Sequence, residues 1–349
     1  MSDPIAGANR RLRIVIPGGS GHLGRILARH FHARGHHVTV VTRTPKHAPW
    51  RVVAWSGHSL DEWVRELDGA DAVINLSGRS VDCRYNAFNR REILDSRIAS
   101  TRVIAEATAS VATPPRVWMN ASTATIYRHS LDRAMDEDGG ELGGNEIDAP
   151  STWRFSIDVA TRWEDAFFAA STPATRKIAL RSAMVMSTSG GAFEMLLRLV
   201  RYGLGGAAGS GGQYMSWVHE VDFARAVEFL LDWNSSEELV NIASPCPVTN
   251  RDFMAALRES CGRKFGLSAS VWMLEFGAVF LRTETELILK SRRVIPGRLL
   301  ESGFQFAFPE WPAAARELVA RWKGLPAPTL NVQRADAGEL KISRVGKGS

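Results

Sequence analysis

The residues that could do chemistry begin with a glycine-rich segment near the N-terminus. Gly19, Gly21 and Gly24 satisfy the spacing G-x-G-x-x-G, and Gly18, Gly21 and Gly24 satisfy the wider spacing G-x-x-G-x-x-G. An apolar run precedes the glycines and an apolar-periodic segment follows them, so the segment is predicted to join a strand to a helix. Glycines there permit a tight turn and let a pyrophosphate approach backbone N–H groups at the positive end of a helix. The alternative is a plain tight turn into a helix.

The end of the next predicted strand bears on which dinucleotide such a loop would hold. Sites that select NAD place an acidic residue roughly 20 positions after the glycines, on the ribose 2′-hydroxyl. Here Arg43 stands at that distance from Gly24, and no acidic residue is nearby. A guanidinium suits a 2′-phosphate, so the sequence favours NADP over NAD. The alternative is a solvated arginine at a strand end.

A regular alternation of predicted strands and helices would position these residues. Such alternation predicts βαβ units, and therefore an α/β fold with a Rossmann-like, doubly wound parallel sheet. We expect Leu76, Ser77 and Gly78, after the fourth strand, to pass under the adenosine and ribose. Ser59 with Glu62 is interpreted as a capping box, and Gly35 as the end of the first helix. The expected strands span 11–16, 37–42, 52–54, 72–76, 117–120 and 178–185, and the helices 23–33, 59–67, 88–110 and 153–170.

The second half of the chain has a more mixed pattern. The patterns favour an NADP-binding domain over 12–185, to which part of 213–244 returns, and a smaller mixed α/β substrate region over 186–323. A flexible tail is expected over 324–349. The second half shows a glycine-rich loop at 203–212, predicted helices near 221–233, 251–261, 271–281 and 310–323, and short strands near 213–218 and 240–244.

Length and composition limit the class of protein. The 349 residues are 45% hydrophobic and 23% charged, as in ordinary soluble globular proteins. The net charge of +6 is spread along the chain, which argues against a nucleic-acid surface. No run approaches the ~18 apolar residues that cross a bilayer, and the N-terminus lacks a secretory signal. Cys83, Cys246 and Cys261 are too few and too scattered for disulfides or a metal site, so a cytoplasmic protein with reduced thiols is expected.

Several further motifs occur in order along the chain. They are Cys83-Arg-Tyr-Asn, Ile93-Leu-Asp-Ser-Arg97, Ser100-Thr-Arg102, Gly203-Leu-Gly-Gly206, Gly209 to Gly212, Ser216-Trp-Val-His219 with Asp222, Arg292-Arg-Val-Ile-Pro296 and Leu299-Leu-Glu-Ser-Gly-Phe304. Together with the glycine loop they resemble an extended short-chain dehydrogenase/reductase of the epimerase/dehydratase-like superfamily. Within this superfamily, the motifs resemble an atypical branch that has a C-terminal domain of uncharacterised function. That branch was once described as cell-division-inhibitor-like. The resemblance covers roughly residues 12–323, and implies NADP(H) binding without a known substrate.

The resemblance also says where catalytic groups should stand. Reductases and epimerases of this superfamily use Ser or Thr with a Tyr-x-x-x-Lys pair, because a tyrosine with a pKa of about 10 needs a nearby ammonium to work near neutrality. Thr123, in Ala121-Ser-Thr-Ala-Thr-Ile-Tyr127, falls at the hydroxyl position. Ser156 stands where the tyrosine is expected and Ala160 where the lysine is expected, and the chain contains no Tyr-x-x-x-Lys.

Two interpretations of this departure remain open. In the first, another acid serves a changed reaction, and Tyr127 is the candidate for it beside Thr123. In the second, the protein binds NADP(H) without turnover. Each candidate has a structural alternative: a packed tyrosine bonded to backbone, and a strand-end threonine that satisfies backbone. The first interpretation is an NADP(H)-dependent oxidoreductase or epimerase-like enzyme acting on a small molecule, and the second a silent sensor or scaffold. The residues expected to contact substrate are Arg84, Tyr85, Gln213 and Trp217.

The remaining expectations concern the cofactor site and assembly. Arg97 falls where the resemblance places a polar residue beside the cofactor, or it forms a helix-surface salt bridge. Glu164 is interpreted as a helix-surface charge, and His219 with Asp222 as a structural pair. The helices at 88–110 and 153–170 often pair across a two-fold axis in related proteins, so a homodimer is expected. The expected cofactor-binding residues are Gly18, Gly19, Ser20, Gly21, His22, Leu23, Gly24, Arg43, Leu76, Ser77, Gly78, Arg97 and Ala121, with no metal ligand.

Overall fold

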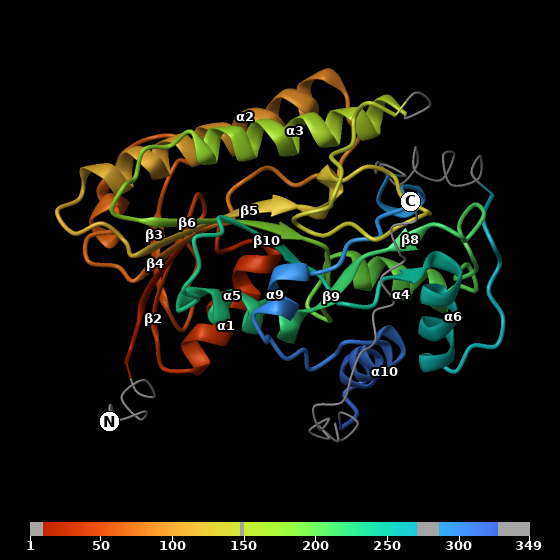
Figure 1. The fold of residues 1–349 in the computed structure, drawn as a ribbon. Coiled ribbons are helices and arrows are strands. Elements are labelled where there is room, and N and C mark those ends of the chain that lie inside the picture. Colours follow the sequence, from red (N-terminus) through yellow and green to blue (C-terminus); the bar gives the residue numbers. More distant parts are fainter. Residues whose placement is uncertain (1–9, 147–149, 271–285, 327–349) are drawn as a thin grey trace.

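A parallel sheet of seven strands forms the centre of the protein in the computed structural model, which describes residues 10–146, 150–270 and 286–326 (Figure 1). The strand order is β10-β6-β5-β4-β1-β2-β3, and every neighbouring pair is parallel. This order confirms the predicted Rossmann-like, doubly wound fold class. The strands are β1 (Arg13–Pro17), β2 (His37–Thr42), β3 (Arg51–Ala54), β4 (Ala72–Asn75), β5 (Val117–Thr123), β6 (Arg176–Ser182) and β10 (Leu239–Ile242).

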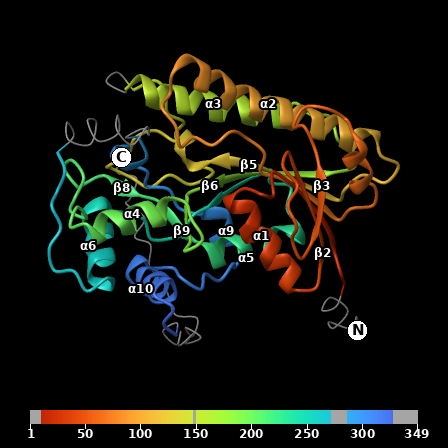
Figure 2. The ribbon, with the colours of Figure 1, turned by 180° about the vertical axis from the view of Figure 1, so that it is seen from behind.

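Helices cover both faces of this sheet. The long helices α2 and α3 lie side by side over one face, and α1 and α5 pack against the other (Figures 1 and 2). Two short 3-10 helices lie in the connections: η1 between β3 and β4, and η2 between β5 and α3. Their bounds are α1 (His22–Ala33), α2 (Ala87–Ser110), α3 (Ser151–Phe168), α5 (Glu220–Leu231), η1 (Glu62–Glu66) and η2 (Ala124–Ile126).

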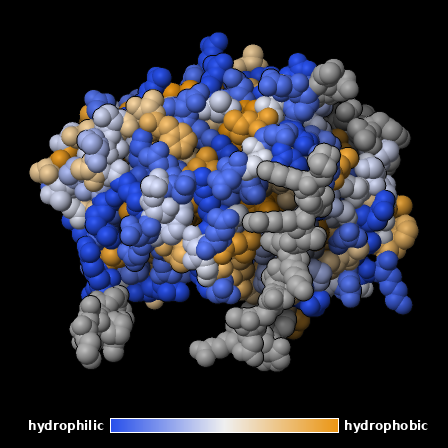
Figure 3. All heavy atoms as spheres, in the orientation of Figure 1, coloured by the Kyte–Doolittle hydropathy of each residue, from blue (hydrophilic) through white to orange (hydrophobic). Residues whose placement is uncertain are grey.

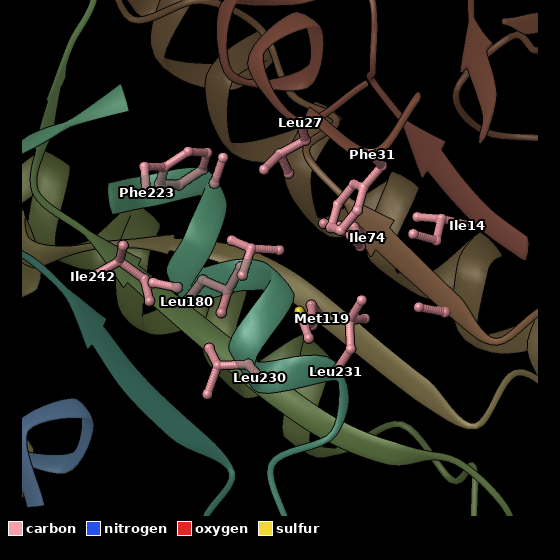
Figure 4. Packing of buried hydrophobic residues seen from close by; sticks show 14 of the residues in the cluster. Ile14, Leu27, Phe31, Ile74, Met119, Leu180, Phe223, Leu230, Leu231 and Ile242 are labelled. Atoms are coloured by element: carbon pink, nitrogen blue, oxygen red, sulfur yellow. The ribbon is translucent and has the colours of Figure 1, made fainter. Parts of the chain in front are cut away.

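The main core lies between the sheet and the layer of α1 and α5. Leu27 and Phe31 of α1 meet Phe223 of α5 above Met119 and Leu180 of the central strands (Figure 4). All five side chains are almost fully buried. Burying each contributes about 1.5–3 kcal/mol relative to exposure, so this layer holds α1 firmly behind the glycine loop.

A second core lies in the part of the chain that follows β6. Trp311 of α10 stacks on Phe253 of α6 with ring centroids 3.7 Å apart, and its other neighbour is Trp217 at 5.0 Å. The division into domains stays a prediction. The elements of this part are α4 (Ala192–Arg201), α6 (Asn250–Ser260), α8 (Glu286–Leu289), α9 (Gly297–Glu301), α10 (Trp311–Trp322) and two small sheets, β7 (Met184–Met186) with β9 (Trp217–His219) and β8 (Tyr214–Met215) with β11 (Val248–Thr249).

His219 and Asp222 hold the C-terminal segment against α5. The ring of His219 is fully buried, and its Nε2 lies 2.9 Å from an Oε atom of Glu317 in α10. The carboxylate of Asp222 accepts backbone N–H bonds from Ala307 and Phe308, both at 2.7 Å. This geometry fits the predicted structural role of the two residues.

Some local predictions were wrong. Ser59 forms no capping box, because η1 begins at Glu62 after Asp61, and the hydroxyl of Ser59 donates to Asp61 Oδ2 at 2.6 Å instead. The sixth strand does not run through to residue 185, since the chain leaves the main sheet after β6 and pairs with β9 instead. The helix expected at 271–281 and the tail from 327 onward lie outside the described residues.

The surface carries mostly polar side chains. The face in Figure 3 is largely hydrophilic, with apolar side chains scattered over it. Of the helices that the structure describes, none combines the length and apolar character needed to cross a membrane.

Candidate cofactor and substrate site

A cavity of about 490 Å³ lies at the carboxyl ends of β1, β4 and β5. A neighbouring hollow of about 520 Å³ shares Gly18, Gly21 and the segment 76–80 with it, so the two form one groove. The groove follows the point where strand order reverses beside β1, which is where nucleotides bind in doubly wound sheets. Expected site residues that line the cavity are Gly18, Gly21, His22, Leu23, Gly24, Leu76, Ser77, Gly78, Tyr85, Arg97, Ala121 and Thr123.

The glycine loop is pressed against the turn that follows β4. Gly18 has a φ of +76°, and a Cβ there would lie 2.7 Å from the backbone of Leu76 and Ser77. A Cβ on Gly24 would lie 2.3 Å from the Cα of Gly19, so only glycine lets α1 start this close to the loop. The first turn of α1 therefore opens into the groove with its backbone N–H groups unobstructed by side chains of the loop.

Two polar groups of this wall lack partners among the described residues. Both ring nitrogens of His22 and the hydroxyl of Ser77 are buried and make no hydrogen bond. Burial, followed by the charges of Arg25 and Arg29, lowers the pKa of His22 against the opposing effect of Glu220, so its ring is neutral at pH 7. Buried polar atoms normally have partners, so these atoms fit a polar ligand such as a dinucleotide in the groove.

Arg43 lies at the far end of the groove. It is exposed after β2 and lines the second hollow together with Ser20 and Gly57. Ser20 Oγ lies 2.7 Å from Thr42 Oγ1, which ties the glycine loop to the end of β2. Among the described residues Arg43 has no ion pair and no hydrogen bond, and its guanidinium is available to an anion.

Arg97 does not form the helix-surface salt bridge that was one alternative for it. Its guanidinium lies over the ring of Trp163 at 5.0 Å and donates to the carbonyls of Arg79 and Ile93 at 3.1 and 2.9 Å. Burial lowers the pKa of Arg97 to about 10. The side chain stays cationic at pH 7 and supports the turn after β4, whose Gly78 lies directly against it.

Thr123 lies in the cavity wall and also bonds to backbone. It lines the cavity, and its Oγ1 accepts the backbone N–H of Thr125 at 3.1 Å, which caps η2. A hydroxyl that accepts one bond still has its own hydrogen to donate. The side chain is thus both fixed by the backbone and able to bond a substrate oxygen.

A buried ion pair lies directly behind Thr123. Glu164 is 7% exposed and accepts a bond from Ser122 Oγ at 2.5 Å and two from Arg181 at 2.8 and 2.7 Å. The interpretation of Glu164 as a helix-surface charge was therefore wrong. The missed signal was Arg181, a charged residue that directly follows the apolar run Ile178-Ala-Leu180 of β6.

Tyr127 does not reach the cavity. Its ring is 1% exposed under the guanidinium of Arg181, and its hydroxyl donates to Asn241 Oδ1 at 3.0 Å. Burial raises the pKa of Tyr127, with the charge of Arg181 opposing it. This position does not fit the expected role of Tyr127 as an acid. It fits the alternative of a packed ring, although the hydroxyl bonds a side chain and not the backbone.

The predicted substrate contacts divide in two. Tyr85 lines the cavity and packs edge-on against Phe155, while Arg84 lies in the same turn without lining it. Gln213 is buried and donates to two carbonyls, and Trp217 lies in the second core, so neither fits a substrate contact. The glycine-rich loop at 203–212 is hydrogen-bonded to residues 267–269 and does not line the cavity.

The structure adds cavity residues that sequence reasoning did not assign. Ser156 of α3 donates to Glu286 Oε2 at 2.5 Å, and Arg292 donates to the carbonyl of Glu286 at 3.2 Å. All three line the cavity, and Glu286 and Arg292 are 3% and 5% exposed. The motif that begins at Arg292 can be recognised in the sequence, but its position beside α3 is seen only in the fold.

Comparison with known proteins identifies the family of the chain. The pattern of the NAD dependent epimerase/dehydratase family matches residues 14–145, and a domain of unknown function, DUF1731, matches residues 271–318. The human epimerase family protein SDR39U1 is 33% identical over 88% of this chain and 100% of its own length. The chain belongs to this epimerase family. Within short-chain dehydrogenase/reductases it is of the extended type, as the motifs predicted.

A second relative and a crystal structure of the human protein extend the comparison for this epimerase family member. An epimerase family protein of Mycobacterium leprae, ML0860, is 31% identical over 86% of this chain and 94% of its own length. The crystal structure of human SDR39U1 isoform 2 with NADPH superposes with a TM-score of 0.77 at 31% identity, over 88% of this chain and 99% of that one.

Proposed function

We propose that this epimerase family protein is an NADP(H)-dependent oxidoreductase or epimerase-like enzyme that acts on a small molecule. The observation that carries the proposal is the continuous groove from Arg43 to Thr123, with an open cavity beside Thr123. Substrate pockets are typically concave, largely apolar and fitted with a few polar groups, as this cavity is.

The choice of NADP over NAD depends on Arg43. Its guanidinium has no partner within the described residues and lies at the groove end that holds the adenosine in this fold. A guanidinium binds a phosphate through charge-assisted hydrogen bonds. The NADPH in the crystal structure of the human relative supports the same choice.

The residues of the chain divide the work of such a site. The glycine loop from Gly18 to Gly24 would hold the pyrophosphate on the N-terminus of α1, and Arg43 the 2′-phosphate. The bound cofactor supplies or accepts a hydride. Thr123 would donate a hydrogen bond to the reacting oxygen of the substrate, which orients it and stabilises negative charge on it.

A silent NADP(H)-binding protein is the second candidate. The absence of a Tyr-x-x-x-Lys pair favours it, and Ala160 at the lysine position is almost fully buried and cannot carry a proton. The open cavity beside Thr123 favours the enzyme, because a sensor needs no such space. We therefore keep the enzyme as the proposal.

Rapid mixing separates the two candidates. Protein preloaded with NADPH is mixed with a panel of aldehydes, ketones and quinones while NADPH absorbance is followed, with Thr123→Ala as the matched variant. Oxidation that Thr123→Ala slows by about 100-fold supports the enzyme. Tight NADPH binding with no oxidation by any compound supports the silent protein, and failure to bind NADPH contradicts both.

The proposal also includes a homodimer and a cytoplasmic location. A homodimer through α2 and α3 would appear as twice the chain mass in sedimentation at micromolar concentration, and a monomeric mass would refute it. The free thiols of Cys83, Cys246 and Cys261 support a reducing, cytoplasmic location.

A further inference from the structure

We infer that Ser156 and Glu286 together form the acid/base pair of this site, in place of the tyrosine that Ser156 replaces. The inference rests on the proposed function, because it assigns the proton step of that reaction. Ser156 lies on α3 at the position of that tyrosine, whereas Glu286 belongs to no motif and comes 130 positions later, at the start of α8.

The geometry brings a proton donor to the expected place. Serine alone is a poor acid, but its Oγ lies 2.5 Å from Glu286 Oε2, a distance typical of a hydrogen bond to a carboxyl group. Both residues line the cavity that Thr123 lines. A hydroxyl bonded to a carboxyl can pass a proton on, receiving one from the carboxyl as it gives up its own.

The surroundings of Glu286 suit a carboxyl that gains and loses a proton. Its side chain is 3% exposed, and burial disfavours the charged form. The guanidinium of Arg292 lies 3.9 Å from Oε1, and the ammonium of Lys290 and the ring of Tyr85 are further neighbours of this group of charges. α3 faces Glu286 with the neutral hydroxyl of Ser156. Burial disfavours the carboxylate form of Glu286, and the two cations favour it.

The proton step balances in both directions. In reduction, a hydride from NADPH forms a C–H bond at the carbonyl carbon, the C=O π electrons move to oxygen, and NADP⁺ remains. The oxygen takes the proton of Ser156, Ser156 takes the proton of Glu286, and the resulting carboxylate lies beside Arg292. Solvent then reprotonates Glu286. In oxidation, the substrate hydroxyl proton follows the reverse path to the ionised Glu286.

The competing explanation is that the hydrogen bond only ties α8 to α3. Glu286→Gln distinguishes the two, because the amide oxygen still accepts the bond from Ser156 while the transferable proton is lost. Asp158→Asn is the matched control: Asp158 lies on the same helix, faces solvent and, within the described part of the chain, pairs with Arg162 alone at 2.8 Å. A structural tie predicts no difference between Glu286→Gln and this control.

The test uses the full-length protein with NADPH and a probe panel of phenanthrenequinone, nitrobenzaldehyde and methylglyoxal. We expect Glu286→Gln and Ser156→Ala to lower the rate of NADPH oxidation by about 100-fold or more, with unchanged NADPH affinity and thermal midpoint. The wild-type rate falls as pH rises through the ionisation of Glu286, and this pH dependence disappears in Glu286→Gln. Asp158→Asn keeps both the rate and the pH profile.

A second readout needs no turnover. The infrared difference spectrum of the apo protein, wild type minus Glu286→Gln, should show the carbonyl stretch of a protonated carboxyl that disappears at the same pH as the reduction rate. A wild type that reduces the probes, with Glu286→Gln equally fast, overturns the acid/base pair and leaves the proposed function standing. A wild type that binds NADPH but reduces no probe overturns both, and a missing carboxyl band at every pH overturns the pair.

Discussion

Replacing Arg181 by methionine tests the buried ion pair that supports the cavity wall. In the native protein the guanidinium makes two bonds to Glu164, and the two side chains are 8% and 9% exposed. Burial lowers the pKa of Arg181, but the bonds to Glu164 overcome this and raise it. Arg181→Met leaves the buried carboxylate with the hydroxyl of Ser122 as its one remaining bond among the described residues.

The magnitude follows from the cost of an unpaired buried charge. Removing one partner of a buried pair costs about 3–5 kcal/mol, a large part of a typical total stability of roughly 5–15 kcal/mol. Adding Glu164→Gln removes the charge and keeps an acceptor for Ser122. We expect the double variant to regain most of the loss, to within about 1–2 kcal/mol of the native protein.

Urea unfolding measures both variants. With a slope of about 3 kcal/mol per molar, Arg181→Met should lower the midpoint by roughly 1 M or more, and the double variant by much less. Arg162→Met is the control, because Arg162 forms an exposed pair with Asp158 worth about 0.3–0.5 kcal/mol. A midpoint shift for Arg181→Met no larger than that of the control would refute the reasoning.

Three further predictions concern other buried groups. Burial lowers the pKa of Lys290 to about 8, so between pH 8 and 10.5 the unfolded chain binds more protons at this residue than the folded chain does. The free energy of unfolding of the wild type should therefore rise across that range by up to about 3 kcal/mol relative to Lys290→Met. A difference between the two proteins in urea unfolding that does not change with pH would contradict this. Tyr127→Phe should cost about 1–2 kcal/mol with an unchanged reduction rate, and a slower rate would restore Tyr127 as the acid. Gly24→Ala should weaken NADPH binding by about tenfold or more, because the new Cβ forces α1 away from Gly19. If calorimetry shows that Gly24→Ala binds NADPH as tightly as the native protein, the close approach of α1 to Gly19 is not needed for binding.

The sheet and its helices could be predicted because their signals are local. Apolar runs such as 11–16 and 37–42 lie near the observed β1 and β2, and Gly35 follows α1 as expected. The capping box predicted at Ser59 was wrong because the side chain of Asp61 competes for the serine hydroxyl, which bonds that carboxylate and not a backbone N–H of the helix. Sequence spacing does not show such competition.

The candidate site could be predicted where short local motifs follow the predicted strands. The glycine loop and Thr123 both reach the groove, because strand ends in a parallel sheet meet at one edge. Glu286 and Arg292 come from a distant segment, and no spacing rule places them beside Ser156. The position of Tyr127 could not be predicted either, because the residues that enclose it, Arg181 and Asn241, come from distant strands.

Titration of the protein with NADPH and NADH tests the central claim most directly, with Arg43→Ala and the exposed control Lys46→Ala measured alongside. We predict that the native protein and Lys46→Ala bind NADPH about tenfold or more tighter than NADH, and that Arg43→Ala loses this preference while it keeps its NADH affinity. Equal affinity of the native protein for the two nucleotides would contradict Arg43 as the selector. Binding of neither would contradict the cofactor site itself.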